Sequence, residues 1–208
     1  MNEFKLEFRQ KYAIAGIFLF LAASLFVVFK VFQAITPFSW NALFWILFLF
    51  ISINALIKSF TQMQSRRFMF YYQLYDPIEL AISKIVYNSL LLFVLGSILF
   101  LLMSGLSLNP IQNLSLFLAG LLLGSIGIGA TISFTSLIAS KGQQTHVLIS
   151  VLSMPVIIPT LLLLIKVTAL AMGILDDTNF MQDISLLIGI NLFSIGLCLI
   201  LFPYLWRI

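Results

Sequence analysis

The chain has 208 residues, of which 62% are apolar and only 9% are charged. Average soluble domains are roughly 45–50% apolar and about 25% charged, so this chain has too few charges to cover a soluble surface. The composition also excludes disordered, collagen-like and nucleic-acid-binding proteins, and the single cysteine, Cys198, excludes a disulfide framework. We therefore expect an integral membrane protein, and the net charge of +4 fits the excess of Lys and Arg in cytoplasmic loops.

Residues 1–12 predict a helix that lies in the membrane interface. Phe4, Phe8 and Tyr12 recur at every fourth position, which places them on one face of a helix with basic residues beside them. An amphipathic segment of this kind buries its apolar face at the boundary of headgroups and acyl chains, while its basic side chains extend to the lipid headgroups.

Six apolar segments follow, and each is long enough to cross a bilayer, which requires about 20 residues of helix. Their continuous apolar runs argue against a β-barrel, whose strands alternate. Backbone groups in lipid must bond within their own segment, so the runs are predicted to be helices. The fold class expected is an all-α integral membrane protein with a single transmembrane domain over residues 1–208, and the spans are residues 13–32, 38–57, 81–103, 114–139, 147–170 and 184–205.

The basic residues predict the orientation of these spans. Nine of the eleven Lys and Arg fall on one side, and only Lys30 and Lys166 fall near the other. The connection between the fifth and sixth spans is acidic, with Asp176, Asp177 and Asp183. Because basic loops stay in the cytoplasm, both termini are expected to be cytoplasmic.

Three helix starts carry capping signals. Residues 76–79 read Asp-Pro-Ile-Glu, residues 109–112 read Asn-Pro-Ile-Gln, and residues 36–37 read Thr-Pro. A polar cap followed by Pro at the first helical position favours the beginning of a helix. The sequence therefore predicts caps at Thr36, Asp76 and Asn109.

The cytoplasmic segment 58–77 has a polar first half that ends in Arg66 and Arg67, and a second half dense in aromatic residues and Met. Such a segment fits two structures equally well. Its aromatic side chains suit the headgroup layer of the membrane, and Arg, Met and aromatic residues are also enriched in protein interfaces.

Spans four and five carry the residues that would shape the helix bundle. Gly120 and Gly124 are spaced to let two helices approach closely, either within one chain or between two subunits. Pro155 and Pro159 each remove a backbone donor and kink span five. Such a kink marks either a moving, cargo-facing element or a purely structural bend.

The residues of ordinary catalysis are missing from the predicted spans, none of which contains an internal Asp, Glu or His. The only histidine, His146, stands at the start of span five, where a polar interfacial role is favoured over a ligand role. Asn54, Asn88 and Asn191 are predicted to form hydrogen bonds between helices. Without a P-loop motif the chain is predicted not to be an enzyme, and ATP hydrolysis is expected in a partner.

Three stretches resemble the haem exporter B family, the ABC-2-like permease subunit of cytochrome c maturation. They are DPIELAISK at residues 76–84, GSIGIG at 124–129 and LISVLSMPVIIP at 148–159. The last, with its Pro-x-x-x-Pro, is the most specific. By span order and length the resemblance covers nearly the whole chain. The sequence departs from the family in the first cytoplasmic loop, which usually carries more acidic residues, whereas residues 58–75 have none.

The resemblance implies a homodimeric permease in the bacterial cytoplasmic membrane, driven by a separate ABC ATPase and placed beside other haem-handling membrane proteins. Haem would be the cargo, and no cofactor or metal is expected. Lys166 and the kink at Pro155 and Pro159 would belong to the cargo path. The residues expected to couple the permease to the ATPase are Arg66, Arg67, Phe68, Phe70, Tyr71, Lys141 and His146.

Two other functions are also compatible with the sequence. The chain could transmit the motion of the ATPase to a neighbouring haem-handling protein without carrying haem itself. Alternatively, it could be an ABC-2 permease for another amphiphile, such as a lipid or a glycan precursor.

Overall fold

The computed structural model describes residues 11–31, 35–63, 77–106, 109–139, 145–174 and 180–206. These residues form six α-helices and contain no β-strand. The predicted interfacial helix lies almost wholly outside the described residues. The helices are α2 (Lys11–Val31), α3 (Pro37–Met63), α5 (Pro77–Leu106), α6 (Leu114–Ala139), α7 (Thr145–Ala171) and α8 (Phe180–Trp206).

Five of these helices, α3 and α5 to α8, are long and apolar enough to cross a membrane. The described apolar part of α2, Leu19–Val31, is shorter. The all-α prediction is therefore confirmed for the described residues, and the chain has the make-up of a multi-pass membrane protein. The predicted fourth span coincides with α6, and each of the other five overlaps one helix that extends beyond it at one or both ends.

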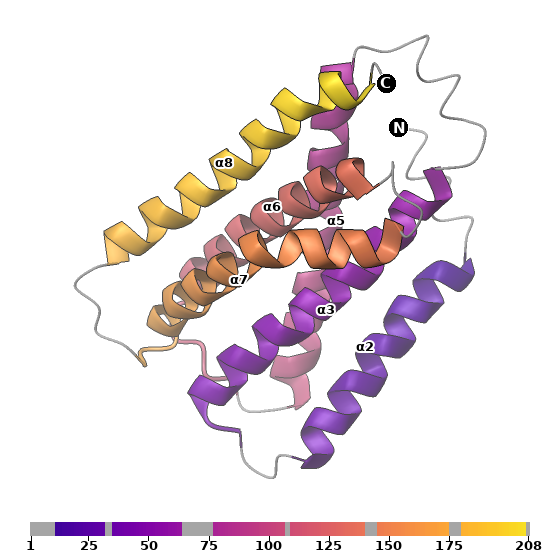
Figure 1. Ribbon diagram of the computed structural model, residues 1–208. Coiled ribbons are helices and arrows are strands. Elements are labelled where there is room, and N and C mark those ends of the chain that lie inside the picture. Colours follow the sequence, from indigo (N-terminus) through magenta and orange to yellow (C-terminus); the bar gives the residue numbers. More distant parts are fainter. Residues whose placement is uncertain are drawn as a thin grey trace.

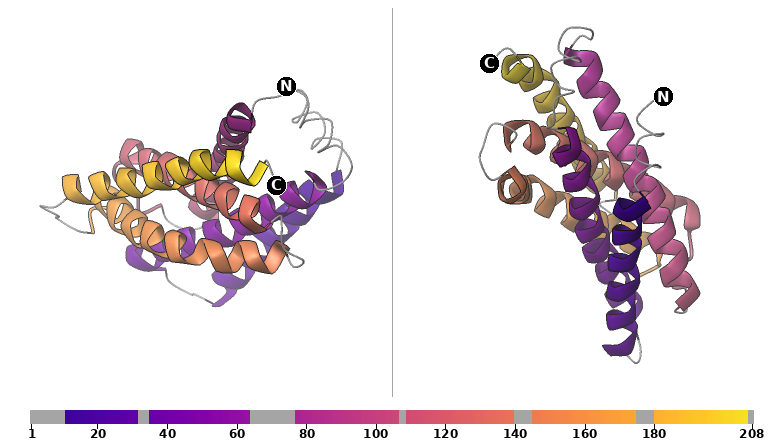
Figure 2. Two further views of the ribbon diagram at one scale, coloured as in Figure 1. Left: turned by 45° about the horizontal axis from the view of Figure 1, so that its top comes forward. Right: turned by 90° about the vertical axis from the view of Figure 1, so that its right-hand side faces the viewer.

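Successive helices run in alternating directions, so that the beginning of α2 and the end of α8 lie at the same end of the bundle (Figures 1 and 2). α6 is the central helix and packs against α5, α7 and α8. α3 packs on α7, α5, α6 and α2, and α2 lies at the edge, in contact with α3 and α5. An even number of alternating helices is what brings both ends of the described chain to one side.

A cluster of aromatic side chains forms the core between α3, α5 and α6. Trp40, Phe44 and Phe48 lie one turn apart on one face of α3, as a spacing of four residues requires. Phe117 of α6 lies 5.1 Å from Phe44 and 5.2 Å from Phe100 of α5, measured between ring centroids. All five are buried, so the cluster joins three helices.

Two of the three predicted helix caps can be compared with the structure. The Thr36 hydroxyl accepts the backbone N–H of Ser39 at 3.3 Å, and α3 begins at Pro37 as predicted. The Asn109 prediction is wrong, because the side chain of Asn113 caps α6 by accepting the backbone N–H of Leu116 at 3.3 Å. Asn109 instead accepts the N–H of Ile111 at 3.1 Å in a local turn. An Asn side chain can stabilise a helix cap or a turn. The Asn-Pro pair at 109–110 therefore does not by itself decide between a cap and a turn.

Candidate functional site

The residues predicted to couple to an ATPase lie mostly outside the described part of the chain. This holds for Lys141 and for the basic and aromatic residues between positions 66 and 71. His146 belongs to the first turn of α7, and its side chain is outside the described part as well. The described candidates are therefore the prolines and Lys166 of α7 and the glycines of α6.

Pro155 and Pro159 lie inside α7, which changes direction along its length (Figure 1). Each proline lacks the N–H that would bond the carbonyl four residues earlier, which leaves the carbonyls of Val151 and Pro155 without their helical partners. Both prolines are exposed, as are Val151 and Ile158 at 63% and 51%. The bend thus lies on a face of α7 that the rest of the described chain does not cover.

Residues 160–171 of α7, in contrast, are tied to α3 by polar contacts. The indole Nε1 of Trp45 donates to the Thr168 hydroxyl at 2.8 Å, and the Asn41 amide nitrogen donates to the backbone carbonyl of Ile165 at 2.8 Å. The Thr168 hydroxyl has one hydrogen to donate, and its two nearest acceptors are the carbonyl of Leu164 at 2.6 Å and Oδ1 of Asn41 at 2.8 Å. Asn41, Trp45 and Thr168 are fully buried, so these bonds are shielded from water and lipid.

The glycines of α6 make room for this α3–α7 contact. A Cβ added to Gly120 would lie 2.9 Å from the Thr168 methyl group, and one added to Gly124 would lie 2.9 Å from the Trp45 ring. The Gly120–Gly124 pair therefore packs against helices of its own chain. This was one of the two roles predicted for it.

The C-terminal end of α7 is held in two further ways. Gly173 has a positive φ of 65°, and backbone bonds from Gly173 to Leu170 (3.1 Å) and from Ile174 to Ala169 (3.1 Å) close the helix. This is the Schellman arrangement, which favours glycine at the left-handed position. The carbonyl of Ala171 then accepts the backbone N–H groups of Gln112 and Asn113 at 3.0 and 2.9 Å, so the connection before α6 is bonded to the end of α7.

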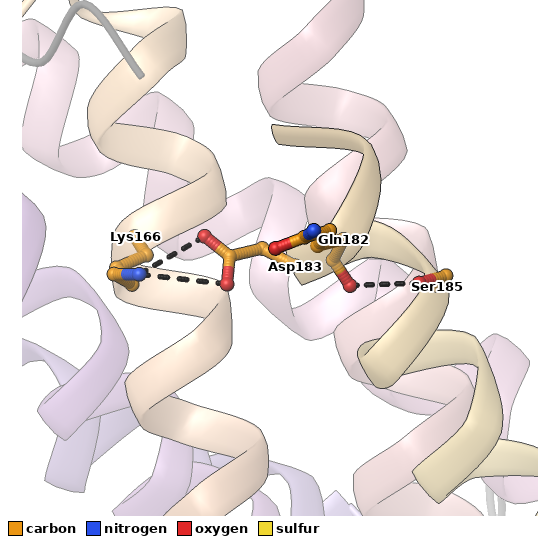
Figure 3. A network of polar contacts seen from close by, with 4 residues as sticks. All are labelled: Lys166, Gln182, Asp183 and Ser185. Atoms are coloured by element: carbon orange, nitrogen blue, oxygen red, sulfur yellow. Dashed lines mark hydrogen bonds and ion pairs between the residues drawn. The ribbon is translucent and has the colours of Figure 1, made fainter. Parts of the chain in front are cut away.

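Lys166 forms an ion pair with Asp183 of α8. Its Nζ lies 3.1 Å from one carboxylate oxygen and 3.4 Å from the other, and the two side chains point toward each other between the two helices (Figure 3). The Lys166 side chain is 53% exposed and that of Asp183 only 10%. A basic residue of the predicted cargo path is thus already engaged by an acidic group of the same chain.

Two of the three predicted asparagine bridges join helices. Asn88 of α5 donates to the Ser133 hydroxyl at 2.7 Å, and Asn191 of α8 donates to the Leu123 carbonyl at 3.0 Å, both on α6. The Asn54 prediction is wrong, because its amide donates to the carbonyl of Phe50 in its own helix from an exposed position. The amide oxygens of Asn88 and Asn191 are buried without a hydrogen-bond partner.

Sequence reasoning missed Asn41, Trp45, Thr168 and Asp183 as partners of the candidate site. The only available signal was that a polar residue within an apolar helix needs a hydrogen-bond partner. Asp183 was assigned to an acidic connection, although it belongs to the first turn of α8. Among the described residues, no three His, Cys, Asp or Glu side chains gather to bind a metal ion.

A scan against protein-family models found no match for this chain, and neither did searches of curated proteins and of solved structures.

Proposed function

We propose that this chain is the permease subunit of an ABC transporter that exports or delivers haem for the assembly of c-type cytochromes. A separate ATPase subunit would drive it, and two copies of the permease would pair in the bacterial cytoplasmic membrane. The resemblance at residues 76–84, 124–129 and 148–159 supports this assignment, and so do the several span-length helices. The full proposal includes six spans and the ABC-2 arrangement, with both termini in the cytoplasm.

The observation that carries the proposal is that two prolines lie in α7 directly before a part of the helix that polar contacts anchor. Residues 160–171 are bonded to α3 and to the connection before α6. Residues 145–159 contain both prolines, with Ile149 and Ile157 buried and Val151 and Leu152 exposed. A permease needs an element that moves against a fixed one, and a few residues at a bend can absorb such a motion.

Coupling to the ATPase would reach this element from the cytoplasmic side. Residues 141–146 lead into α7 and include its first two residues, so a force on this connection would act first on the proline-containing part. The longer segment with Arg66, Arg67, Phe68, Phe70 and Tyr71 would be the main docking site of the ATPase. Other haem-handling membrane proteins would receive the cargo or pass it on.

The cargo chemistry suits an amphiphile. Haem is a flat and mostly apolar ring with two carboxylates. The bend of α7 offers exposed apolar side chains, and Lys166 provides a positive charge about two turns beyond Pro159. We expect such a contact to hold haem without an axial iron ligand from a membrane-embedded histidine of this chain.

The test is complementation of a strain from which the gene is deleted. We expect the deletion to abolish haem-stained c-type cytochromes, the His146→Ala variant to restore them nearly fully, and the double variant Pro155→Ala and Pro159→Ala to restore them poorly at a normal protein level. Normal c-type cytochromes in the deletion strain would overturn the proposal. A lipid or glycan defect in that strain would assign the chain to another amphiphile.

A further inference from the structure

One face of α7 combines exposed apolar side chains with a cation. Ile158, Leu162 and Lys166 follow each other at intervals of four residues and therefore share a face of the helix. Ile158 is 51% exposed and Leu162 61% exposed, and the Lys166 side chain is 53% exposed. An apolar surface about two turns long thus ends at a positive charge, and we call these three residues the α7 strip.

The charge at the end of the α7 strip already binds a carboxylate. Both oxygens of Asp183 lie within 3.4 Å of the Lys166 Nζ, and Figure 3 shows the two groups facing each other from α7 and α8. The structure therefore shows that the Lys166 ammonium can bind a carboxylate between α7 and α8.

The two partners of this ion pair differ in how firmly they are held. Asp183 is nearly buried and lies in the first turn of α8, where the unpaired backbone N–H groups and the helix dipole favour a negative charge. Lys166 is half-exposed and has a flexible four-carbon side chain. Lys166 is consequently the partner that can turn away, and Asp183 keeps a favourable environment when it does.

We propose that Asp183 occupies Lys166 in the place of a cargo carboxylate, and that a carboxylate-bearing amphiphile displaces it. The apolar body of the amphiphile would lie on Ile158 and Leu162 while its carboxylate binds the Lys166 ammonium. Lys166 has a carboxylate partner before and after the exchange, whereas Asp183 loses its ion pair and is left with the helix dipole at the N-terminus of α8. This inference rests on the proposed function and adds to it the ligand class, the binding residues and a built-in competitor.

The test uses the full chain in phosphatidylcholine nanodiscs, with protoporphyrin IX and its dimethyl ester as probes and empty nanodiscs subtracted. The ester keeps the ring but lacks the carboxylates. We expect the wild type to prefer the acid over the ester. Lys166→Met should weaken binding of the acid about tenfold, as loss of a charge-assisted contact implies, and leave the ester unaffected. Lys166→Arg should keep the preference.

The Asp183→Asn variant separates this proposal from simple attraction to a lysine. Removing the competing carboxylate should tighten binding of the acid about threefold, in line with the strength of a half-exposed ion pair, and leave the ester unchanged. Lys30→Met, which removes an exposed cation from the last turn of α2, is the matched control and should bind like the wild type.

The proposal is overturned if Lys166→Met keeps the preference for the acid, or if Asp183→Asn binds the acid like the wild type. If the wild type and Lys166→Met bind the acid equally in phosphatidylglycerol nanodiscs, Lys166 is occupied by anionic lipid, and this result would also overturn the proposal. Failure here is distinguishable from failure of the proposed function, because cytochrome assembly in the deletion strain is measured without either Lys166 or Asp183 being changed.

Discussion

The indole N–H of Trp45 on α3 donates to the hydroxyl of Thr168 on α7, 2.8 Å away, and both side chains are fully buried. The two residues are 123 positions apart in the chain. This bond is one of several that hold residues 160–171 of α7 in place, directly after the part of the helix that contains the prolines. In the proposed permease, residues 160–171 would be the fixed part of α7.

The first prediction concerns the strength of this bond. Thr168→Val keeps the volume of the side chain but leaves the buried Trp45 N–H without an acceptor, so the free energy of unfolding should fall by about 1–3 kcal/mol. Reversible unfolding in mixed micelles measures this difference. Ser185→Ala, which removes an exposed hydroxyl bonded within its own helix, should change stability by less than about 0.5 kcal/mol. Equal stability of the two variants would contradict the prediction.

The second prediction compares two glycines in different surroundings. A Cβ at Gly124 would lie 2.9 Å from two ring carbons of Trp45, whereas a Cβ at Gly189 on α8 would have no neighbour within 4 Å. Gly124→Ala should therefore destabilise the protein by about 1–3 kcal/mol through overpacking. Gly189→Ala should be neutral or stabilising by up to about 1 kcal/mol, because Ala favours a helix. Thermal melts of the two purified variants test this, and a stabilised Gly124→Ala variant would show that the α3–α6 contact is loose.

The third prediction is the orientation in the membrane. In a background without Cys198, which is buried, cysteines placed at Asn109 and Asn179 should react with an impermeant thiol reagent added to intact cells. A cysteine at Ser65 should react only after the membrane is opened. The physical reason is the retention of basic connections in the cytoplasm. Labelling of the cysteine at position 65 in intact cells would contradict the predicted orientation.

The fourth prediction concerns the segment expected to dock on the ATPase. Reversing both Arg66 and Arg67 to Glu should reduce co-purification of the ATPase while the chain still inserts into the membrane, because charges at the rim of an interface must complement those of the partner. The matched control reverses Lys5 and Arg9 to Glu and should leave co-purification unchanged. If both double variants retain the ATPase equally, the segment lies on lipid instead.

The positions of the helices could be predicted from the sequence because the bilayer admits few alternatives. The predicted span 114–139 has the same ends as α6, and the predicted cap at Thr36 is confirmed. The cap at Asn109 and the bridge at Asn54 were predicted wrongly for a common reason. Asn can bond its own turn, its own helix or a neighbouring helix, and only the surrounding structure selects among these partners.

The sequence by itself determined that the chain is apolar and built of helices long enough for a membrane, because lipid leaves a backbone no partner outside its own helix. Only the tertiary structure decided which faces meet: Gly124 with Trp45, Trp45 with Thr168, and Lys166 with Asp183. The physical reason is that lipid and protein interior are both apolar. A membrane helix therefore carries little of the hydrophobic periodicity that reveals the buried face of a soluble one.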